Sequence, residues 1–183
     1  MANRFMEDMK AHPYTKAVLD AWRRLAEGAA GVDGPMADDY PGLIGNLFVL
    51  NHVGEGDYCF RRVGSDVERL FGRQLGEHNF LSLWSEPDRS LLAAALKSAA
   101  LNRGPARVRA SGETLDGRRM DMEFALAPLS GHLDNTTRFL GLCQGISPIR
   151  ALGGRPLRRL SVSAIYPPPP EPRRAAIRLV SSR

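Results

Sequence analysis

The stretch that decides the fold is FRRVGSDVERLFGRQLGEHNFLSLW, residues 60–84. Ser65 is a good helix N-cap, and Glu68 three residues later completes the spacing of a capping box. Gly72 suits the left-handed position that ends many helices. The apolar face of this short helix consists of Val67, Leu70 and Phe71. A helix of this length is not stable alone, so we expect it to close over a larger element.

Upstream of this stretch the sequence predicts one helix and one β-hairpin. Residues 14–27 repeat apolar side chains at helical spacing, with Trp22 on the apolar face. Two strands, near 46–52 and 57–63, then flank a glycine-containing turn. In the second strand, period-two alternation places Tyr58, Phe60 and Arg62 on one side.

Downstream, Ser85 is the N-cap of a helix that runs to Gly104, and three strands follow it. These strands cover 106–111, 118–129 and 137–146. The first two carry opposite charges on their polar faces, which favours antiparallel pairing. We therefore expect an α+β fold, with a five-stranded antiparallel sheet and helices on one face.

Charge divides the chain into a neutral body and a basic tail. Residues 1–150 carry 18 Lys or Arg and 19 Asp or Glu, whereas residues 151–183 carry 7 Arg and 1 Glu. The tail also holds Pro167–Pro170 and lacks a core-forming period, so we expect it to be disordered. We divide the chain into an N-terminal helix and loop (1–35), a folded domain (36–150) and this basic, proline-containing tail (151–183).

The order of elements, and several short motifs, resemble a PAS domain. The closer resemblance is to short, stand-alone bacterial PAS proteins, and it covers roughly residues 14–146. The residues that carry it are Phe60-Arg61, Gly64-Ser65, the LFGR turn at 70–73, Gly76, and the segment from Phe80 to Trp84. The sequence departs from the family pattern at Arg62, where an apolar residue is expected. The resemblance implies a sensory or regulatory module whose short helices close over the concave face of the sheet.

Under that lid lies either packed core or a ligand pocket. The candidate pocket residues are Tyr58, Phe60, Arg62, His78, Trp84 and Phe124. An inward Arg62 would need an anionic ligand, because an unpaired buried charge is costly. Otherwise its side chain extends outward at the strand end. His78 is either a loop residue or a haem ligand of the kind that haem-bearing PAS domains carry in this region.

The sequence does not identify a cofactor; we expect neither haem nor flavin, and no catalysis. One histidine is weak evidence for haem, and a flavin photosensor of this fold would need a reactive cysteine in the lid. Cys59 and Cys143 both fall in strands and have no metal-type spacing. No recognised catalytic motif is present, so we expect the protein not to be an enzyme.

The expected partners are a second copy of the chain and a signalling protein, with a small-molecule ligand as a further option. Trp22 on the first helix is a candidate contact. The tail residues Arg158, Arg159, Arg173 and Arg174 could bind nucleic acid, acidic lipid or an acidic protein. A ligand-free adaptor and a nucleic-acid-associated regulator remain the alternatives. The absence of a secretory leader or long apolar segment predicts a cytoplasmic protein without a transmembrane span.

Overall fold

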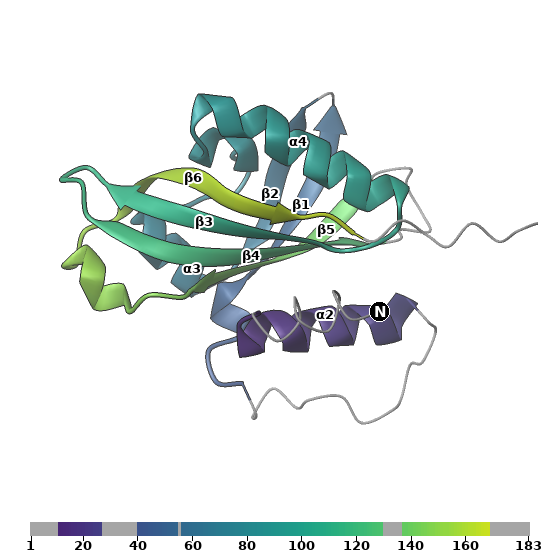
Figure 1. Ribbon diagram of the computed structural model, residues 1–183, viewed down its shortest axis with the longest axis horizontal. Coiled ribbons are helices and arrows are strands. Elements are labelled where there is room, and N and C mark those ends of the chain that lie inside the picture. Colours follow the sequence, from purple (N-terminus) through teal and green to yellow (C-terminus); the bar gives the residue numbers. More distant parts are fainter. Residues whose placement is uncertain (1–10, 27–39, 55, 130–136, 169–183) are drawn as a thin grey trace, which may run out of the picture.

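The computed structural model describes residues 11–26, 40–54, 56–129 and 137–168. Its centre is one curled antiparallel sheet with the strand order β2-β1-β5-β4-β3-β6 (Figure 1). The strands are β1 (Leu47–Gly54), β2 (Asp57–Val63), β3 (Ala106–Thr114), β4 (Arg119–Leu129), β5 (Arg138–Gly145) and β6 (Leu157–Tyr166). The predicted α+β class is confirmed, with six strands in place of five.

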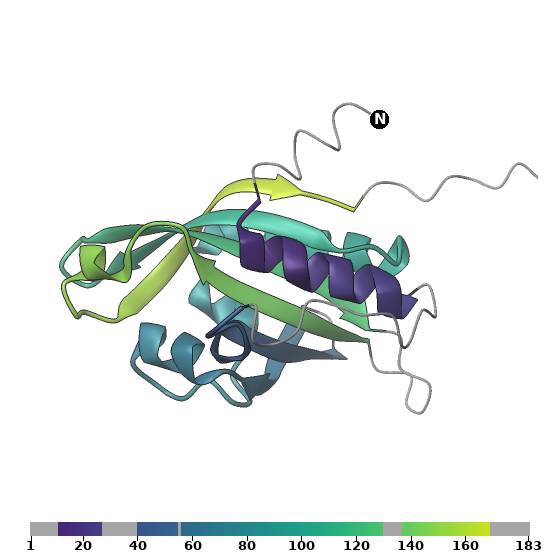
Figure 2. The same ribbon diagram turned by 90° about the horizontal axis from the view of Figure 1, so that it is seen from below.

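Helices lie on both faces of this sheet (Figures 1 and 2). The concave face is covered by α3 (Ser65–Phe71), the 3₁₀ helix η3 (Phe80–Leu83) and α4 (Glu86–Leu101). The predicted lid is therefore present, on the predicted side of the sheet. The amphipathic α2 (Pro13–Ala26) packs on the opposite face, against β4 and β5. Two further 3₁₀ helices are η2 (Ile44–Asn46) and η4 (Ile149–Leu152).

The segment between α3 and α4 connects the two edges of the sheet. Asn79 forms a bridge with Cys59 of β2, and Trp84 forms a bridge with Leu160 of β6. Backbone hydrogen bonds support both ends: the Phe60 amide donates to the carbonyl of His78 (3.0 Å), and the Ser85 amide donates to that of Leu160 (2.9 Å). The curled sheet and this segment thus enclose the core between them, and each edge strand is paired with the segment at one point.

Two of the three predicted capping residues, Gly72 and Ser85, cap a helix in the structure, and Ser65 does not. Gly72 adopts the left-handed conformation with φ 61°, and Ser85 is the N-cap of α4. Ser65, however, is already helical, and the N-cap of α3 is Gly64. A Cβ at Gly64 would lie 2.3 Å from the carbonyl oxygen of Gly45, so a side chain at the capping position has no room. The partner predicted for the box, Glu68, instead accepts a hydrogen bond from the Leu75 amide at 3.2 Å.

Strand β6 lies within the tail that the sequence predicts to be disordered, and this prediction is wrong for residues 157–166. The strand pairs antiparallel with β3 along its length. Two register shifts interrupt the pairing. The shift between Glu113 and Thr114 skips Arg158, so Leu157 and Leu160, three residues apart, both lie on the buried side. Because a strand with such irregularities lacks strict alternation, its sequence does not show a period of two.

Candidate functional site

The space beneath the lid is filled by aromatic side chains. Tyr58, Phe60, Trp84 and Phe124, four of the six predicted pocket residues, are brought together there and are all buried. Phe80 packs among them, with its ring centroid 5.8 Å from that of Phe60 and 5.7 Å from that of Trp84. Trp84 in turn lies 5.1 Å from Phe124. These contacts favour the packed-core alternative over a preformed interior pocket.

The other two predicted pocket residues lie outside the core. Arg62 is exposed. In the pairing with β1, Leu50 faces Phe60 and Val49 faces Arg62, so Arg61 is an extra residue in a β-bulge. The bulge reverses the side on which Arg62 lies, so it does not share the face of Tyr58 and Phe60, and the outward alternative holds. His78 is also exposed, and its Nδ1 lies 3.0 Å from the carbonyl oxygen of Gly76, as an ordinary loop histidine would.

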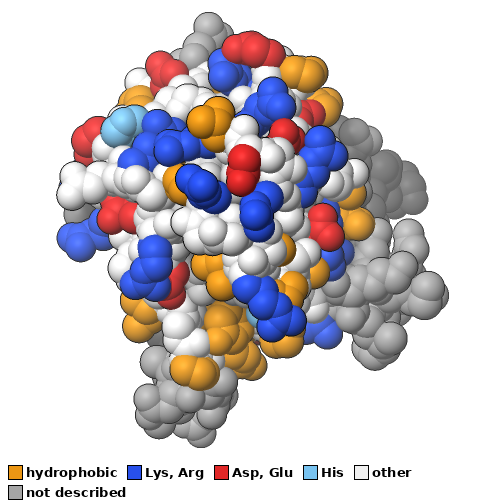
Figure 3. Space-filling view, turned by 90° about the vertical axis from the view of Figure 1, so that its left-hand side faces the viewer, with side chains coloured by type: hydrophobic (Ala, Val, Ile, Leu, Met, Phe, Trp, Pro, Cys, Tyr) orange, Lys and Arg blue, Asp and Glu red, His pale blue; other side chains and the backbone are white. Residues whose placement is uncertain are grey.

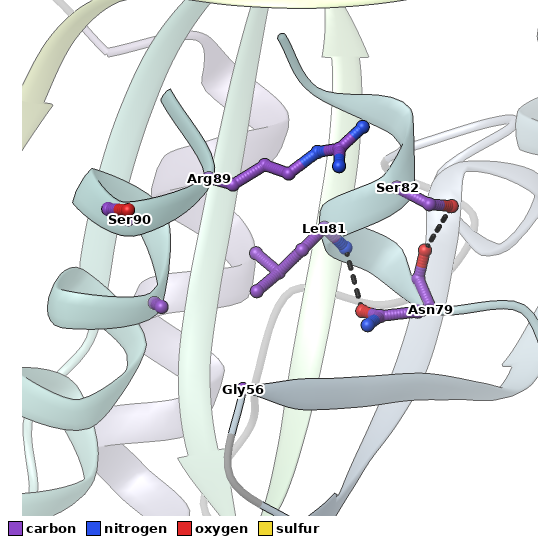
Figure 4. A pocket seen from close by; sticks show the side chains of 7 residues that line it. Gly56, Asn79, Leu81, Ser82, Arg89 and Ser90 are labelled. Atoms are coloured by element: carbon purple, nitrogen blue, oxygen red, sulfur yellow. Dashed lines mark hydrogen bonds between the residues drawn. The ribbon is translucent and has the colours of Figure 1, made fainter. Parts of the chain in front are cut away.

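A shallow hollow of about 290 Å³ lies between the turn after β1, η3 and α4 (Figure 4). Its polar groups are largely occupied by the protein itself. The Asn79 side chain accepts a hydrogen bond from the Leu81 amide at 3.0 Å and donates to Asp57 at 2.8 Å. Arg89 donates from Nε to the carbonyl oxygen of Trp84 at 3.1 Å. These hydrogen bonds hold the lid in place and leave few polar groups in the hollow that could bind a ligand.

A buried group of charged side chains lies on the other face of the sheet, beneath the start of α2. Glu123 on β4 is fully buried. Its Oε2 lies 2.7 Å from Nε of Arg109 and 3.7 Å from Nη1 of Arg107, both on β3. Its Oε1 accepts a hydrogen bond from the backbone amide of His12 at 2.9 Å. We call these four residues the glutamate cluster.

The sequence indicates part of this cluster. The pairing of arginines on β3 with acids on β4 is as expected, and Arg109 lies directly opposite Glu123 in the register. What the sequence does not indicate is that the chain at the start of α2 packs over Glu123, so that its carboxylate is fully buried. The guanidinium of Arg107 is covered further by the ring of Tyr166 on β6, with its Cζ 4.3 Å from the ring centroid.

Helix α2 is held on the sheet by a small apolar patch and one hydrogen bond at its far end. Val18 and Leu19 pack against Ala125 and Leu142. The indole Nε1 of Trp22 donates to the carbonyl oxygen of Pro128 at 2.7 Å. Trp22, predicted to contact a partner, is thus half-buried against its own sheet.

The arginines predicted to bind partners fall in two places. Arg158 and Arg159 lie on β6 and are exposed, whereas Arg173 and Arg174 lie outside the described residues.

Neither cysteine thiol is activated. Burial strongly raises the pKa of the Cys143 thiol. The pKa of Cys59 is raised by burial and, to a smaller extent, by the negative charges of Asp57 and Glu77. Across the described ranges, no group of three or more metal-ligating side chains is present, and no helix is long and apolar enough to span a membrane.

The family comparison agrees with this architecture. The sequence model of the PAS domain matches residues 9–144, which include α2, the lid and the first five strands. The chain belongs to the PAS-domain family. PAS domains are sensory and regulatory modules, and the resemblance drawn from the LFGR turn and its neighbours is confirmed. Strand β6 lies beyond the matched region.

Solved structures similar to this PAS domain include several light-oxygen-voltage domains. The dark structure of the blue-light photoreceptor Aureochrome1 LOV domain shares 16% identity and has a TM-score of 0.44; the match covers 58% of this chain and 78% of that one. A fungal LOV domain photoreceptor also shares 16% identity with a TM-score of 0.44, over 72% and 96% of the two chains. An RNA-binding light-oxygen-voltage receptor shares 18% identity with a TM-score of 0.45, over 64% and 35%. No curated protein matches the sequence.

The expectation that this PAS domain binds neither haem nor flavin stays a prediction. A flavin between the lid and the sheet would need the space that Phe80, Trp84 and Phe124 occupy. The absence of catalytic activity and the cytoplasmic location also stay predictions.

Proposed function

We propose that this PAS domain is a regulatory module that signals through its outer sheet face, with α2 as the element that moves. A partner, or a second copy of the chain, competes with α2 for the apolar patch around Ala125 and Leu142. The observation that carries this proposal is the glutamate cluster, which ties the start of α2 to the sheet through a buried carboxylate.

The contacts of α2 suit an equilibrium between docked and released states. Its buried side chains are few and of modest size, namely Thr15, Ala17, Val18 and Leu19. The lid face, by contrast, buries most of the aromatic core. Segments with few buried apolar contacts open at lower free energy than the core, so α2 should leave the sheet without unfolding it. A partner that binds only the released state would then shift the equilibrium.

A small-molecule signal remains an option within this proposal. Ligand entry beneath the lid would displace the packed aromatic rings, and the sheet could transmit the change to α2. The filled interior supports a contact signal more directly than a ligand signal.

The pH should change how firmly α2 is docked. Burial, in part offset by Glu123 and reinforced by Arg109, lowers the pKa of His12 below its ordinary value of 6.5. The neutral ring also accepts a hydrogen bond at Nδ1 from the Tyr14 amide at 3.2 Å. The released state therefore binds a proton more readily, so docking is full above pH 6.5 and weakens as the pH falls below it. We expect the indole N–H resonance of Trp22 to shift toward its released position on acidification, and His12→Asn to reduce this shift.

The proposal is tested by removing the charge of Glu123 in the full chain. Glu123→Gln keeps the shape but removes the buried negative charge that pairs with Arg107 and Arg109, so α2 should be released more often. We expect the Trp22 indole resonance to move toward its released position and light scattering to detect more dimer than for the wild type. Glu113→Gln, which removes a carboxylate from the more exposed β3–β6 side, is the matched control. A docked α2 in Glu123→Gln, with the oligomeric state unchanged, would contradict the proposal.

A further inference from the structure

One end of the sheet carries a dense group of arginines. The β3–β4 turn, η4 and the start of β6 meet there, at the left of Figures 1 and 2. We call this group the arginine end; its members are Arg118, Arg119, Arg150, Arg155, Arg158 and Arg159, all exposed. Three acidic residues, Glu113, Asp116 and Asp121, lie in the same strands and turn, which leaves an excess of three positive charges. Figure 3 shows Lys and Arg side chains spread over this end, with single hydrophobic side chains between them.

The arginine end is one continuous surface, although its residues come from separate parts of the sequence. A Cβ at Gly153, directly after η4, would lie 2.5 Å from Nη1 of Arg118 on the β3–β4 turn. A hollow of about 240 Å³ is lined jointly by that turn and the start of β6, through Leu115, Asp116, Arg155, Pro156 and Arg158. Because these segments touch, their charges act on the same partner.

Half of these arginines have no acidic partner among the residues that the structure describes. Arg118 pairs with Asp116 at 3.2 Å, while Arg119 and Arg159 share Glu113 at 3.3 and 3.8 Å. Within the described part of the chain, no carboxylate lies within 4.0 Å of Arg150, Arg155 or Arg158. Their guanidinium groups are therefore available to an anionic partner.

Large apolar side chains project from the same surface. Leu115 at the tip of the β3–β4 turn is 90% exposed, and Ile149 at the start of η4 is 61% exposed. No aromatic residue occurs in residues 113–119 or 146–159. Single-stranded nucleic acids are commonly bound by aromatic stacking next to cations, whereas aliphatic side chains at a projecting tip suit the boundary of a lipid bilayer.

We propose that the arginine end docks the protein on an anionic lipid bilayer. The unpaired arginines bind lipid phosphates and carboxylates, and Leu115 and Ile149 enter the region between headgroups and acyl chains. Clusters of cations of this size attract acidic leaflets, and the attraction falls off within a Debye length. This inference is independent of the proposed movement of α2, which covers a different face of the sheet.

The test uses the full chain and vesicles in a flotation assay. Vesicles of phosphatidylcholine mixed with phosphatidylserine should bind the protein, and vesicles of phosphatidylcholine alone should not. Arg155→Gln with Arg158→Gln should weaken binding roughly tenfold or more, because each cation near the surface contributes a several-fold factor. Leu115→Ser should weaken it severalfold through the lost apolar contact. The matched control is Lys97→Gln with Arg103→Gln, which removes two exposed cations at the end of α4.

Several outcomes would overturn the proposal. One is equal loss of binding in the control and in the arginine variant, which would indicate adsorption by net charge. A second is unchanged binding of Leu115→Ser, which would exclude insertion of the turn. A third is arginine-dependent binding of a short RNA or DNA duplex without binding to vesicles, which would make nucleic acid the partner. None of these measurements depends on whether α2 leaves the sheet.

Discussion

Trp84→Ala should lower the free energy of unfolding by about 3–5 kcal/mol, the usual cost of removing a fully buried large aromatic side chain. Trp84 is 1% exposed, and its ring packs against those of Phe80 and Phe124. Its backbone also bridges the lid to β6 through Leu160. Loss of the indole would leave a cavity between the lid and the sheet that these neighbours cannot fill completely. Urea denaturation followed by circular dichroism measures the effect.

The matched control for this variant is Trp22→Ala. It removes the same side chain from a half-buried position on α2, so the global free energy of unfolding should change much less. A cost of under about 1 kcal/mol for Trp84→Ala would show that the side chain is not tightly packed. The interior would then be a pocket that accepts ligand, and the contact-signalling proposal would lose its support.

Glu123→Ala should destabilise the docked protein by about 3 kcal/mol, because it removes the buried carboxylate that pairs with Arg107 and Arg109. Arg107 has only 8% of its side chain exposed, and the ring of Tyr166 covers its guanidinium. We expect α2 to leave the sheet before the core unfolds, so that the loss appears first at the Trp22 indole. Thermal unfolding followed at that resonance and by far-UV circular dichroism separates the two events.

The control for Glu123→Ala is Glu113→Ala, which breaks ion pairs to Arg119 and Arg159 on the surface. Exposed pairs contribute at most about 1 kcal/mol, so this variant should be close to wild type. If both glutamate variants have the same small effect, the glutamate cluster does not hold α2 in place.

The sequence predicts the first five strands and the lid because each has a strong local signal. Strands β4 and β5 are long and rich in apolar residues, and the LFGR turn brings a helix end and a left-handed glycine together. The same reasoning fails where the pairing is irregular. A bulge at Arg61 reverses Arg62, and two register shifts remove the alternation of β6. Neither irregularity can be detected from the alternation of apolar and polar residues in the sequence.

The glutamate cluster escapes prediction for a different reason. Arg107, Arg109 and Glu123 lie on the faces of β3 and β4 that the sequence predicts to be polar, and Arg109 lies opposite Glu123 as the charge pattern predicts. Burial of Glu123 depends on where α2 docks, which is a tertiary contact between segments more than 100 residues apart. The sequence alone also does not decide whether the interior is filled, because Tyr58, Phe60, Trp84 and Phe124 can either line a cavity or pack into a core, although such residues more often pack.

Amide hydrogen exchange resolved by residue can show whether α2 opens separately from the sheet. We expect amides of α2 to exchange through an opening of lower free energy than those of β4 and β5. Acidification through pH 6.5, or Glu123→Gln, should lower this free energy further while the strands change less. If α2 exchanged only with the global unfolding of β4 and β5, it would be a fixed part of the core. The proposed signal through the outer face would then be wrong.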